Sequence, residues 1–363
     1  MAAKMTLRER VTAALRGEMP DMIPFTCYEE MMPQGRDRSR LHELGVAVFS
    51  RIYPFRIRRD RVRVETRDIR DERYAGNLTV YETPVGTLTQ KQIVEPGYGS
   101  LWTTEHLIKK PEDYAIFEFI LRDETCEPDV DGFLKHDASF GDLGLAVPRA
   151  ADPPMQELWR RYSGLERFSL DWFDCRDEVM RVLKAFDERN ERIWRIVADT
   201  PSEFCSSGGN LSGDMVGPPM FRQLILPHFE REARIIHAAG KRTMNHMDGM
   251  LKSLVEVVGT CPIDIVEAFN PVPDGNVSVA DVRRAWPGKT LSINFPSSVH
   301  LRPKESIREI AIQILREAAP GKAFVMGITE DVPLNVIVES MTTIATTLNE
   351  YGRCPIEPGS LPG

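Results

Sequence analysis

The feature that most constrains this chain is a regular alternation of short apolar segments with longer amphipathic ones, beginning near Gly144. Strands are predicted at 145–148, 203–206, 242–245, 263–269, 291–295 and 324–328. Helices are predicted between them at 177–197, 218–239, 250–258, 279–285, 304–319 and 334–351. Alternation at this spacing is typical of parallel βαβ units.

Two further apolar segments, 23–27 and 46–52, bring the number of predicted strands to about eight. Eight such units favour a closed (β/α)8 barrel over an open sheet, and 363 residues is an ordinary length for a decorated barrel. No GxGxxG follows the first strand, which argues against a dinucleotide-binding fold. We therefore predict an α/β protein with a TIM-barrel fold.

The segment 78–93 departs from the barrel rhythm, because it alternates polar and apolar residues around the turn signal Pro84-Val85-Gly86. This pattern predicts a β-hairpin inserted in the N-terminal part of the chain. The sequence has no recognisable interdomain linker. Residues 1–353 are therefore expected to form one barrel domain, and the Pro/Gly-rich segment 354–363 a loose tail.

Charge and cysteine usage exclude several classes of protein. The net charge is −8 with both signs mixed, unlike the concentrated basic face of a nucleic-acid binder. Arginines do gather between Arg51 and Arg63, but acidic residues follow at once. We interpret this run as a solvated strand pair, with a docking patch for an acidic partner or a phosphate-bearing cofactor as the alternative. The six cysteines are scattered, and there is neither a secretory signal nor a membrane-spanning segment, so we expect a cytoplasmic protein with reduced thiols.

Polar side chains follow four of the predicted strands, where a barrel places its catalytic groups. His246 and Asp248 come at the end of 242–245, Glu267 lies within an otherwise apolar strand, Asn294 ends 291–295, and Glu330 follows 324–328. A buried carboxylate such as Glu267 costs several kcal/mol unless it is paired. The alternatives are a core salt bridge for Glu267 and a satisfied interior imidazole for His246.

His246, Glu267 and Glu330 are together predicted to hold one metal ion, because zinc takes imidazole and carboxylate ligands and keeps one position open in catalytic sites. Asp248 is predicted as a fourth ligand or as a group that orients the imidazole. Cys205 is interpreted as a buried structural thiol, and Cys261 is expected at the opposite end of the barrel.

Several segments are similar to the uroporphyrinogen decarboxylase superfamily. The first is Met5-Thr6-Leu7-Arg8-Glu9-Arg10-Val11-Thr12-Ala13-Ala14-Leu15-Arg16-Gly17, followed by Ile23-Pro24. The second ends in His237-Ala238-Ala239-Gly240-Lys241 and His246-Met247-Asp248-Gly249. The resemblance covers nearly the whole chain and implies a (β/α)8 barrel, a homodimer, and one of two activities. These are decarboxylation of uroporphyrinogen and corrinoid-dependent methyl transfer, usually assisted by zinc.

Departures from the decarboxylase motifs favour the methyltransferase branch. Where the decarboxylases have an aspartate in a Phe-Ser-Asp-Ile strand end, this chain has Phe49-Ser50-Arg51-Ile52. The methyltransferase branch has His-x-Cys-Gly where this chain has His246-Met247-Asp248-Gly249, and a second cysteine near 328–330. Only His246 matches as a ligand, so Asp248 and Glu330 would substitute with oxygen. Gly327-Ile328-Thr329-Glu330-Asp331 is most similar to members of that branch.

From this resemblance we expect a methyltransferase that moves a methyl group between a small methylated substrate, such as an aryl methyl ether, and a corrinoid (cobalamin) carried by a partner protein. Zinc would be held by His246, Glu267 and Glu330. Asp248 and Asn294 would orient ligands or substrate, and Tyr28 would line the cleft. The alternatives are decarboxylation of a tetrapyrrole or another carboxylated substrate, and a non-catalytic corrinoid-binding protein.

Overall fold

The computed structural model describes residues 4–70, 74–94 and 101–362. The contacts divide the chain into two compact units. The first contains Met1–Pro54, Val130–Arg149 and Val197–Gly363, and the second contains Phe55–Asp129 and Ala150–Ile196. The sequence suggested a single barrel domain because no linker separates the units. Each unit is instead assembled from segments that alternate along the chain.

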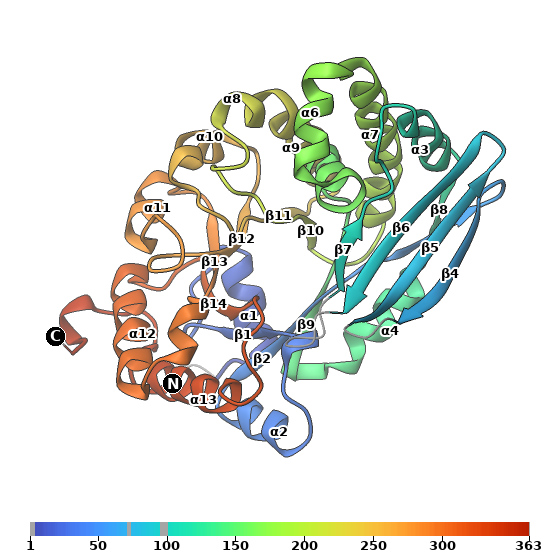
Figure 1. Ribbon diagram of the computed structural model, residues 1–363. Coiled ribbons are helices and arrows are strands. Elements are labelled where there is room, and N and C mark those ends of the chain that lie inside the picture. The colour runs from blue at the N-terminus through green and yellow to red at the C-terminus, as the bar shows by residue number, and fades with distance from the viewer. Residues whose placement is uncertain (1–3, 71–73, 95–100, 363) are drawn as a thin grey trace. The chain divides into compact units, whose positions relative to one another are not determined.

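An eight-stranded parallel sheet forms the centre of the first unit, in the order β10-β11-β12-β13-β14-β1-β2-β9 (Figure 1). Its strands are β1 (Phe25–Tyr28), β2 (Val46–Ile52), β9 (Gly144–Pro148), β10 (Phe204–Gly208), β11 (Arg242–His246), β12 (Ile265–Phe269), β13 (Thr290–Asn294) and β14 (Phe324–Ile328). A parallel bridge between Arg149 and Ser206 joins the two edges. The predicted α/β barrel is therefore confirmed, and all eight strands lie at or within a few residues of the predicted positions.

Helices of the first unit lie outside the strands (Figure 1). They are α1 (Leu7–Leu15), α2 (Arg36–Glu43), α4 (Val130–Ser139), α8 (Pro218–Met220), α9 (Leu226–Ala238), α10 (Val255–Thr260), α11 (Val279–Ala285), α12 (Lys304–Ala318) and α13 (Ile337–Tyr351). The helix expected at 218–239 contains a π-helical turn at Phe221–Ile225. Pro227 near the start of α9 has no N–H to donate, which suits a change of hydrogen-bond pattern there.

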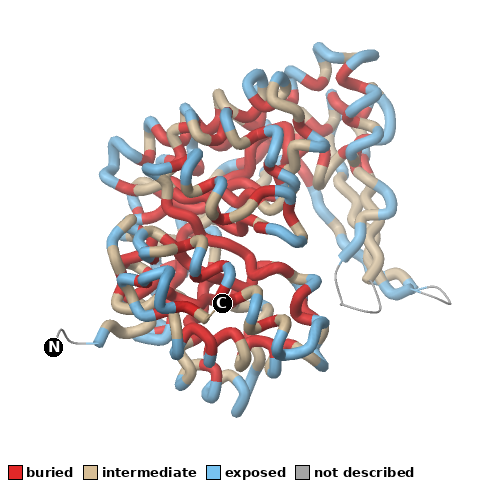
Figure 2. The backbone as a smooth tube through the Cα atoms, turned by 90° about the vertical axis from the view of Figure 1, so that its left-hand side faces the viewer, coloured by how far each residue is buried: buried red, intermediate tan, exposed pale blue. Residues whose placement is uncertain are grey.

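The interior of the barrel is apolar toward its amino-terminal end. Figure 2 shows in red how much of the chain is buried. One buried cluster joins side chains from seven strands: Tyr28, Ala47, Phe49, Leu145, Val147, Phe204, Met244, Ile265 and Val325. Val11, Ala14 and Leu15 of α1 belong to the same cluster. Since Thr290 at the start of β13 and Arg242 at the start of β11 both bond to the end of α1, this helix closes the amino-terminal end of the barrel.

Strand geometry places polar side chains one layer above this cluster. Side chains two residues apart on a strand face the same side. Arg51 therefore follows Phe49 into the barrel, His246 follows Met244, and Glu267 follows Ile265. The carboxyl end of the barrel thus carries a polar layer above an apolar floor.

The second unit contains the predicted hairpin within a larger sheet. β5 (Ala75–Thr83) and β6 (Gly86–Val94) form the hairpin, confirming that part of the fold prediction, while β4 (Arg63–Arg70) and β7 (Leu101–Glu105) extend it to four antiparallel strands. β3 (Phe55–Arg59) pairs with β8 (Glu124–Pro128) in a second antiparallel sheet. The helices are α3 (Asp113–Arg122), α5 (Pro154–Glu157), α6 (Gly164–Asp174) and α7 (Arg176–Ala198), whose last two residues belong to the first unit.

The interpretation of the arginine run as a solvated strand pair holds for only part of the run. Arg56, Arg58 and Arg59 belong to β3, which pairs with β8 and not with β4, and each of these arginines forms an ion pair with an acidic residue. Arg51 belongs to β2 and faces the barrel interior, with only 11% of its side chain exposed. The run is divided among three sheets, because Arg63 begins β4 of the four-stranded sheet, and sequence spacing did not reveal this division.

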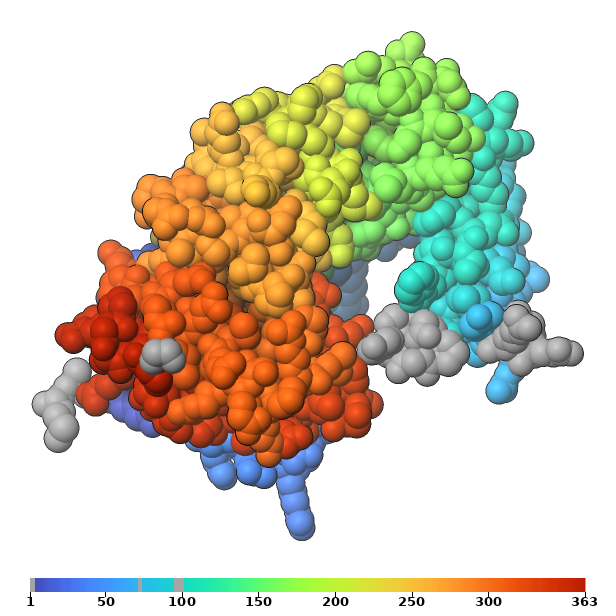
Figure 3. All heavy atoms as spheres, turned by 60° about the vertical axis from the view of Figure 1, so that its left-hand side comes forward, coloured from blue at the N-terminus to red at the C-terminus, as the bar shows by residue number. Residues whose placement is uncertain are grey.

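The part of the first unit from β10 to the carboxyl terminus consists of successive βα units and a short final segment. In the space-filling view the chain from β10 onward forms contiguous bands from yellow to red, as expected when successive βα units pack side by side (Figure 3). The segment expected to be a loose tail buries Ile356 and Leu361, and the N–H of Ile356 donates to the carbonyl of Pro320. Across the described residues, no helix is long and apolar enough to span a bilayer.

Candidate active site

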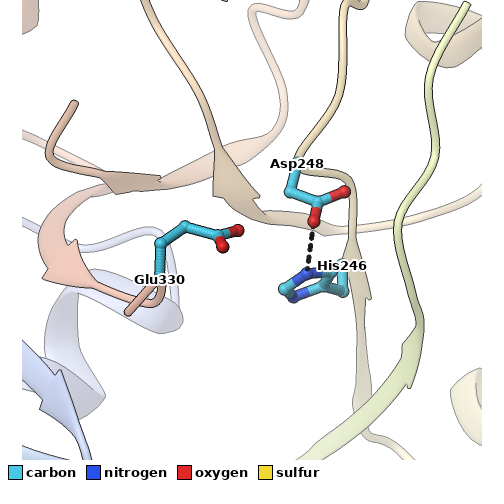
Figure 4. Close-up of side chains that lie close together, drawn as sticks. All are labelled: His246, Asp248 and Glu330. Atoms are coloured by element: carbon cyan, nitrogen blue, oxygen red, sulfur yellow. Dashed lines mark ion pairs between the residues drawn. The ribbon is translucent and has the colours of Figure 1, made fainter. Parts of the chain in front are cut away.

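Three predicted side chains converge at the carboxyl ends of β11 and β14 (Figure 4). His246 is the last residue of β11, Asp248 follows in the next loop, and Glu330 lies two residues beyond β14. Each offers a ligand atom within 4.8 Å of the others, and Nε2 of His246 is 3.4 Å from a carboxylate oxygen of Asp248. One imidazole nitrogen and two carboxylates form a donor set that suits a zinc ion with an open coordination position.

Glu267 lies on the other side of the imidazole. Its carboxylate is 2.8 Å from Nδ1 of His246, and the hydroxyl of Tyr28 donates a short hydrogen bond to it. Nη1 of Arg51 is 3.3 Å from the same carboxylate and 3.0 Å from Nδ1. Because Glu267 faces Nδ1 while Asp248 faces Nε2, Glu267 is outside the group that could share one ion with His246.

The charges of these groups account for their protonation. Burial opposes a charge on His246, but the charge of Glu267 and hydrogen bonds to Asp248 and Glu267 raise its pKa to about 9. Burial likewise opposes ionisation of Glu267, yet Arg51 and His246 lower its pKa to about 2. Glu267 is therefore a carboxylate, and it stabilises a proton on Nδ1.

Glu330 behaves differently from Glu267. Burial and the charge of nearby Asp248 raise the pKa of Glu330 to about 7. Two carboxylates held close together repel one another, and a cation bound between them relieves that repulsion. The pair Asp248 and Glu330 therefore fits a metal ion on electrostatic grounds as well as by donor type.

The backbone beside Glu267 is irregular. Ala268 has a φ of 56°, in the left-handed region that a residue with a Cβ rarely adopts, and the register between β12 and β13 shifts between Val266 and Phe269. Such bulges often redirect a side chain next to an active site. This bulge follows directly after the residue that holds the imidazole.

A chain of amide groups links the loops that carry Asp248 and Glu330. The amide nitrogen of Asn270 donates to the carbonyl of Asp248 at 2.7 Å, and Asn294 donates to the side-chain oxygen of Asn270 at 3.0 Å. The oxygen of Asn294 accepts from the N–H of Thr329, next to Glu330, at 2.9 Å. Asn294 thus links the loops that carry the two carboxylates and is not itself one of the three candidate metal ligands.

The loop that bears Asp248 is also fixed from the β10 side. Asn210 donates to the carboxylate of Asp248 at 2.8 Å, and the N–H of Gly249 donates to the carbonyl of Leu211. A Cβ on Gly249 would lie 2.5 Å from that same carbonyl oxygen. Only glycine allows this close approach of the two loops, which explains its place directly after Asp248.

The predicted residues therefore fall into three groups. His246, Asp248 and Glu330 converge; Tyr28 and Glu267 contact the imidazole from the Nδ1 side; and Asn294 supports the loops. From the sequence, Arg51 is considered only as part of the arginine run, and Asn270 and Asn210 are not considered, because only their side-chain directions bring them to the site. The side chain of Cys205, on β10, faces α9 with its thiol 3.7 Å from Glu232, and burial raises its pKa well above the ordinary value.

Comparison with protein families identifies the chain. The model of the family described as uroporphyrinogen decarboxylase (URO-D) matches residues 164–351, more than half of the sequence. The chain belongs to the uroporphyrinogen decarboxylase family. The matched residues include strands β10 to β14 and the site residues His246, Asp248, Glu267, Asn294 and Glu330.

Solved structures support the barrel of this URO-D family member. A methyltransferase from Methanosarcina mazei superposes with a TM-score of 0.59 over 96% of this chain and 99% of that chain. The two sequences are 13% identical, so the likeness establishes the shared fold. No curated protein sequence matches this chain.

Proposed function

We propose that this URO-D family protein is a corrinoid-dependent methyltransferase, moving a methyl group between a small methylated substrate and a corrinoid carried by a partner protein. The observation that carries the proposal is the convergence of His246, Asp248 and Glu330 within 4.8 Å at the carboxyl end of the barrel. Barrel enzymes place their chemistry at this end. The methyltransferase fold of the Methanosarcina mazei protein is consistent with it.

The proposed metal is zinc, and its proposed ligands are Nε2 of His246 and one oxygen each from Asp248 and Glu330. Asp248 replaces Glu267 in the ligand set expected from sequence, because Glu267 faces the opposite ring nitrogen. When bound, zinc supplies Lewis-acid polarisation of the heteroatom that carries or receives the methyl group.

The chain's own residues prepare that chemistry. Glu267 accepts a hydrogen bond from the Nδ1–H of His246, so the lone pair of Nε2 would face the ion once the second ring proton has left. Asn270 and Asn294 fix the spacing of Asp248 and Glu330. In demethylation, the bond between the methyl carbon and its heteroatom would break and the heteroatom would keep that electron pair. A reduced corrinoid on the partner protein would supply the electron pair of the new bond to the methyl carbon.

The rim of the barrel suits a protein partner. Each of the five loops after β10 to β14 exposes one large apolar side chain: Met215, Met250, Val272, Leu301 and Leu334. Leu301 is 64% exposed and Leu334 is 90% exposed. Exposed apolar residues gathered around a site are typical of protein-interaction surfaces. This rim supports delivery of the corrinoid by a partner that covers the mouth.

The first experiment measures zinc per chain by mass spectrometry, together with consumption of methylcobalamin in the presence of small phenols and thiols. We expect about one zinc per chain. His246→Ala and Glu330→Ala should each lose the zinc and the transfer while keeping the wild-type circular dichroism spectrum. His237→Ala is the matched control, because His237 pairs with Asp264 ahead of β12, at the opposite end of the barrel.

The competing function is metal-free decarboxylation of a carboxylated substrate, which the position of Arg51 beside His246 and Glu267 favours. A protein that takes up no zinc even when zinc is supplied would exclude the methyl-transfer proposal. The same result would direct attention to decarboxylation, with Arg51 as the group that binds the carboxylate. Wild-type transfer by His246→Ala would be equally decisive against methyl transfer through this site.

A further inference from the structure

Among the described residues of the polar layer, Arg51 is the group that the proposed chemistry leaves unused. Its guanidinium lies over the ring of Tyr28, 4.0 Å from the ring centroid, and its Nη1 is 3.3 Å from Glu267. These two contacts fix both the plane and one end of the guanidinium. Such an arrangement holds the group in a single orientation before any ligand arrives.

The other edge of this guanidinium is open. Among the residues that the structure describes, Nε and Nη2 of Arg51 have no hydrogen-bond partner, and neither atom is sealed from solvent. These two nitrogens form the fork that binds a carboxylate through two parallel hydrogen bonds. A fork that is held rigidly, open and 11% exposed inside a barrel is suited to a small anion.

A second guanidinium group follows the neighbouring strand. Arg149 comes directly after β9, the strand that pairs with β2, and its guanidinium carbon is 5.6 Å from the ring centroid of Tyr53.

We propose that the open fork of Arg51 binds a carboxylate of the substrate, so that the methylated substrate is a small carboxylic acid. That the substrate is methylated rests on the proposed function, whereas the anion subsite rests on the geometry of Arg51 alone. Arg51 would anchor one end of the substrate while its methyl-bearing heteroatom lies toward Asp248 and Glu330. No proton, electron or bond is exchanged at Arg51.

Calorimetric titration with 4-methoxybenzoate and with the uncharged 4-methoxybenzamide tests this subsite. Both titrations are made on protein as purified and after removal of metal, because a carboxylate that only coordinates zinc loses its affinity when the metal is removed. We expect the carboxylate to bind both forms, and to bind at least about tenfold more tightly than the amide.

Substitutions locate the binding. Glu267→Gln keeps the guanidinium and should still bind the carboxylate, whereas the double variant Arg51→Gln/Glu267→Gln should lose about tenfold or more of that affinity. Both residues are replaced in the double variant because removing Arg51 alone would leave the buried Glu267 without its cation. Arg51→Lys should bind weakly, since an ammonium group cannot present a fork.

The control for binding elsewhere is Arg16→Gln. Arg16 lines a cavity of about 710 Å³ at the amino-terminal end of the barrel, where Arg8 and Lys4 also lie. Wild-type affinity in Arg16→Gln is the expected result. Affinity that depends on Arg16, that vanishes with the metal, or that equals that of the amide would overturn the proposal.

The outcome also separates this inference from the proposed function. A zinc-loaded protein that transfers methyl groups but shows no carboxylate preference would refute the anion subsite alone. A protein that binds the carboxylate through Arg51 but never holds zinc would refute methyl transfer and leave the subsite in place.

Discussion

At the scale of single residues, the two nitrogens of His246 face different groups. Nδ1 meets the carboxylate of Glu267 at 2.8 Å, and Nε2 meets Asp248 at 3.4 Å. A ring nitrogen that donates to a carboxylate fixes the tautomer and makes the other nitrogen a better metal ligand. Glu267 therefore acts by orienting the imidazole, whereas Asp248 lies on the side of the ring where a metal ion would bind.

Replacement of this carboxylate should weaken the metal site without destroying it. Glu267→Gln keeps a hydrogen-bond acceptor of the same shape but removes the charge, so we expect the zinc affinity to fall by about 10- to 100-fold. Competition with a fluorescent chelator measures the dissociation constant. His246→Ala provides the comparison, since loss of a ligand should abolish measurable binding. An affinity equal to that of the wild type would show that Glu267 does not act on the imidazole.

At the scale of elements, a buried histidine ties the loop after β13 to the last helix. His300, in the 3-10 turn Ser297–Leu301, forms a 2.6 Å hydrogen bond with Ser340 in α13 and packs against Phe295. Burial lowers the pKa of His300 to about 4. The side chain is only 2% exposed, so protonation inside the fold is strongly disfavoured.

This histidine should make the protein sensitive to acid. The unfolded chain takes up a proton at His300 near pH 6.5, whereas the folded protein does so only near pH 4. The stability contributed by the neutral form is therefore present above pH 6.5 and is lost as the pH falls to 4, by at most about 3 kcal/mol.

Thermal melts between pH 7 and pH 4 measure this effect. His300→Gln removes the titrating group and can still bond to Ser340, so its melting temperature should fall less steeply with pH than that of the wild type. His237→Gln serves as the control, because His237 lies on the exposed side of α9. Parallel melting curves for the wild type and His300→Gln would refute the assignment.

At the scale of the molecule, the barrel separates stability from chemistry along its axis. The lower interior is filled by one apolar cluster that α1 closes, and the polar layer lies above it. The rim beyond the polar layer carries the exposed side chains of the β10 to β14 loops. Changes at the rim should therefore alter partner binding while leaving both the fold and the metal site intact.

The rim is tested by placing a charge on it. Leu301→Asp should slow methyl transfer involving a protein-bound corrinoid by about tenfold or more, because a charge in an apolar interface is costly, and it should leave the rate with free cobalamin unchanged. Leu134→Asp is the matched control, since Leu134 is an exposed leucine beside the amino-terminal cavity. Equal effects of Leu301→Asp on both forms of the corrinoid would argue against docking at the rim.

The sequence alone is enough to predict the α/β barrel and the strand ends from which His246, Asp248 and Glu330 emerge. Period-two and helical patterns report which residues face the core, and in a parallel barrel every strand delivers its end to the same rim. The hairpin 78–93 was also readable, because the turn at Pro84-Val85-Gly86 is a local signal. Each of these inferences depends on neighbours along the chain.

The separate roles of the site residues become visible only in the folded barrel. Glu267 and Asp248 are both carboxylates near His246 in sequence order, and nothing local tells which ring nitrogen each one meets. Arg51 read as the start of a solvated arginine run, yet the pairing of β2 with β1 and β9 turns it inward. Side-chain direction around a closed barrel depends on register and bulges set by strands distant in sequence, such as the irregularity at Ala268.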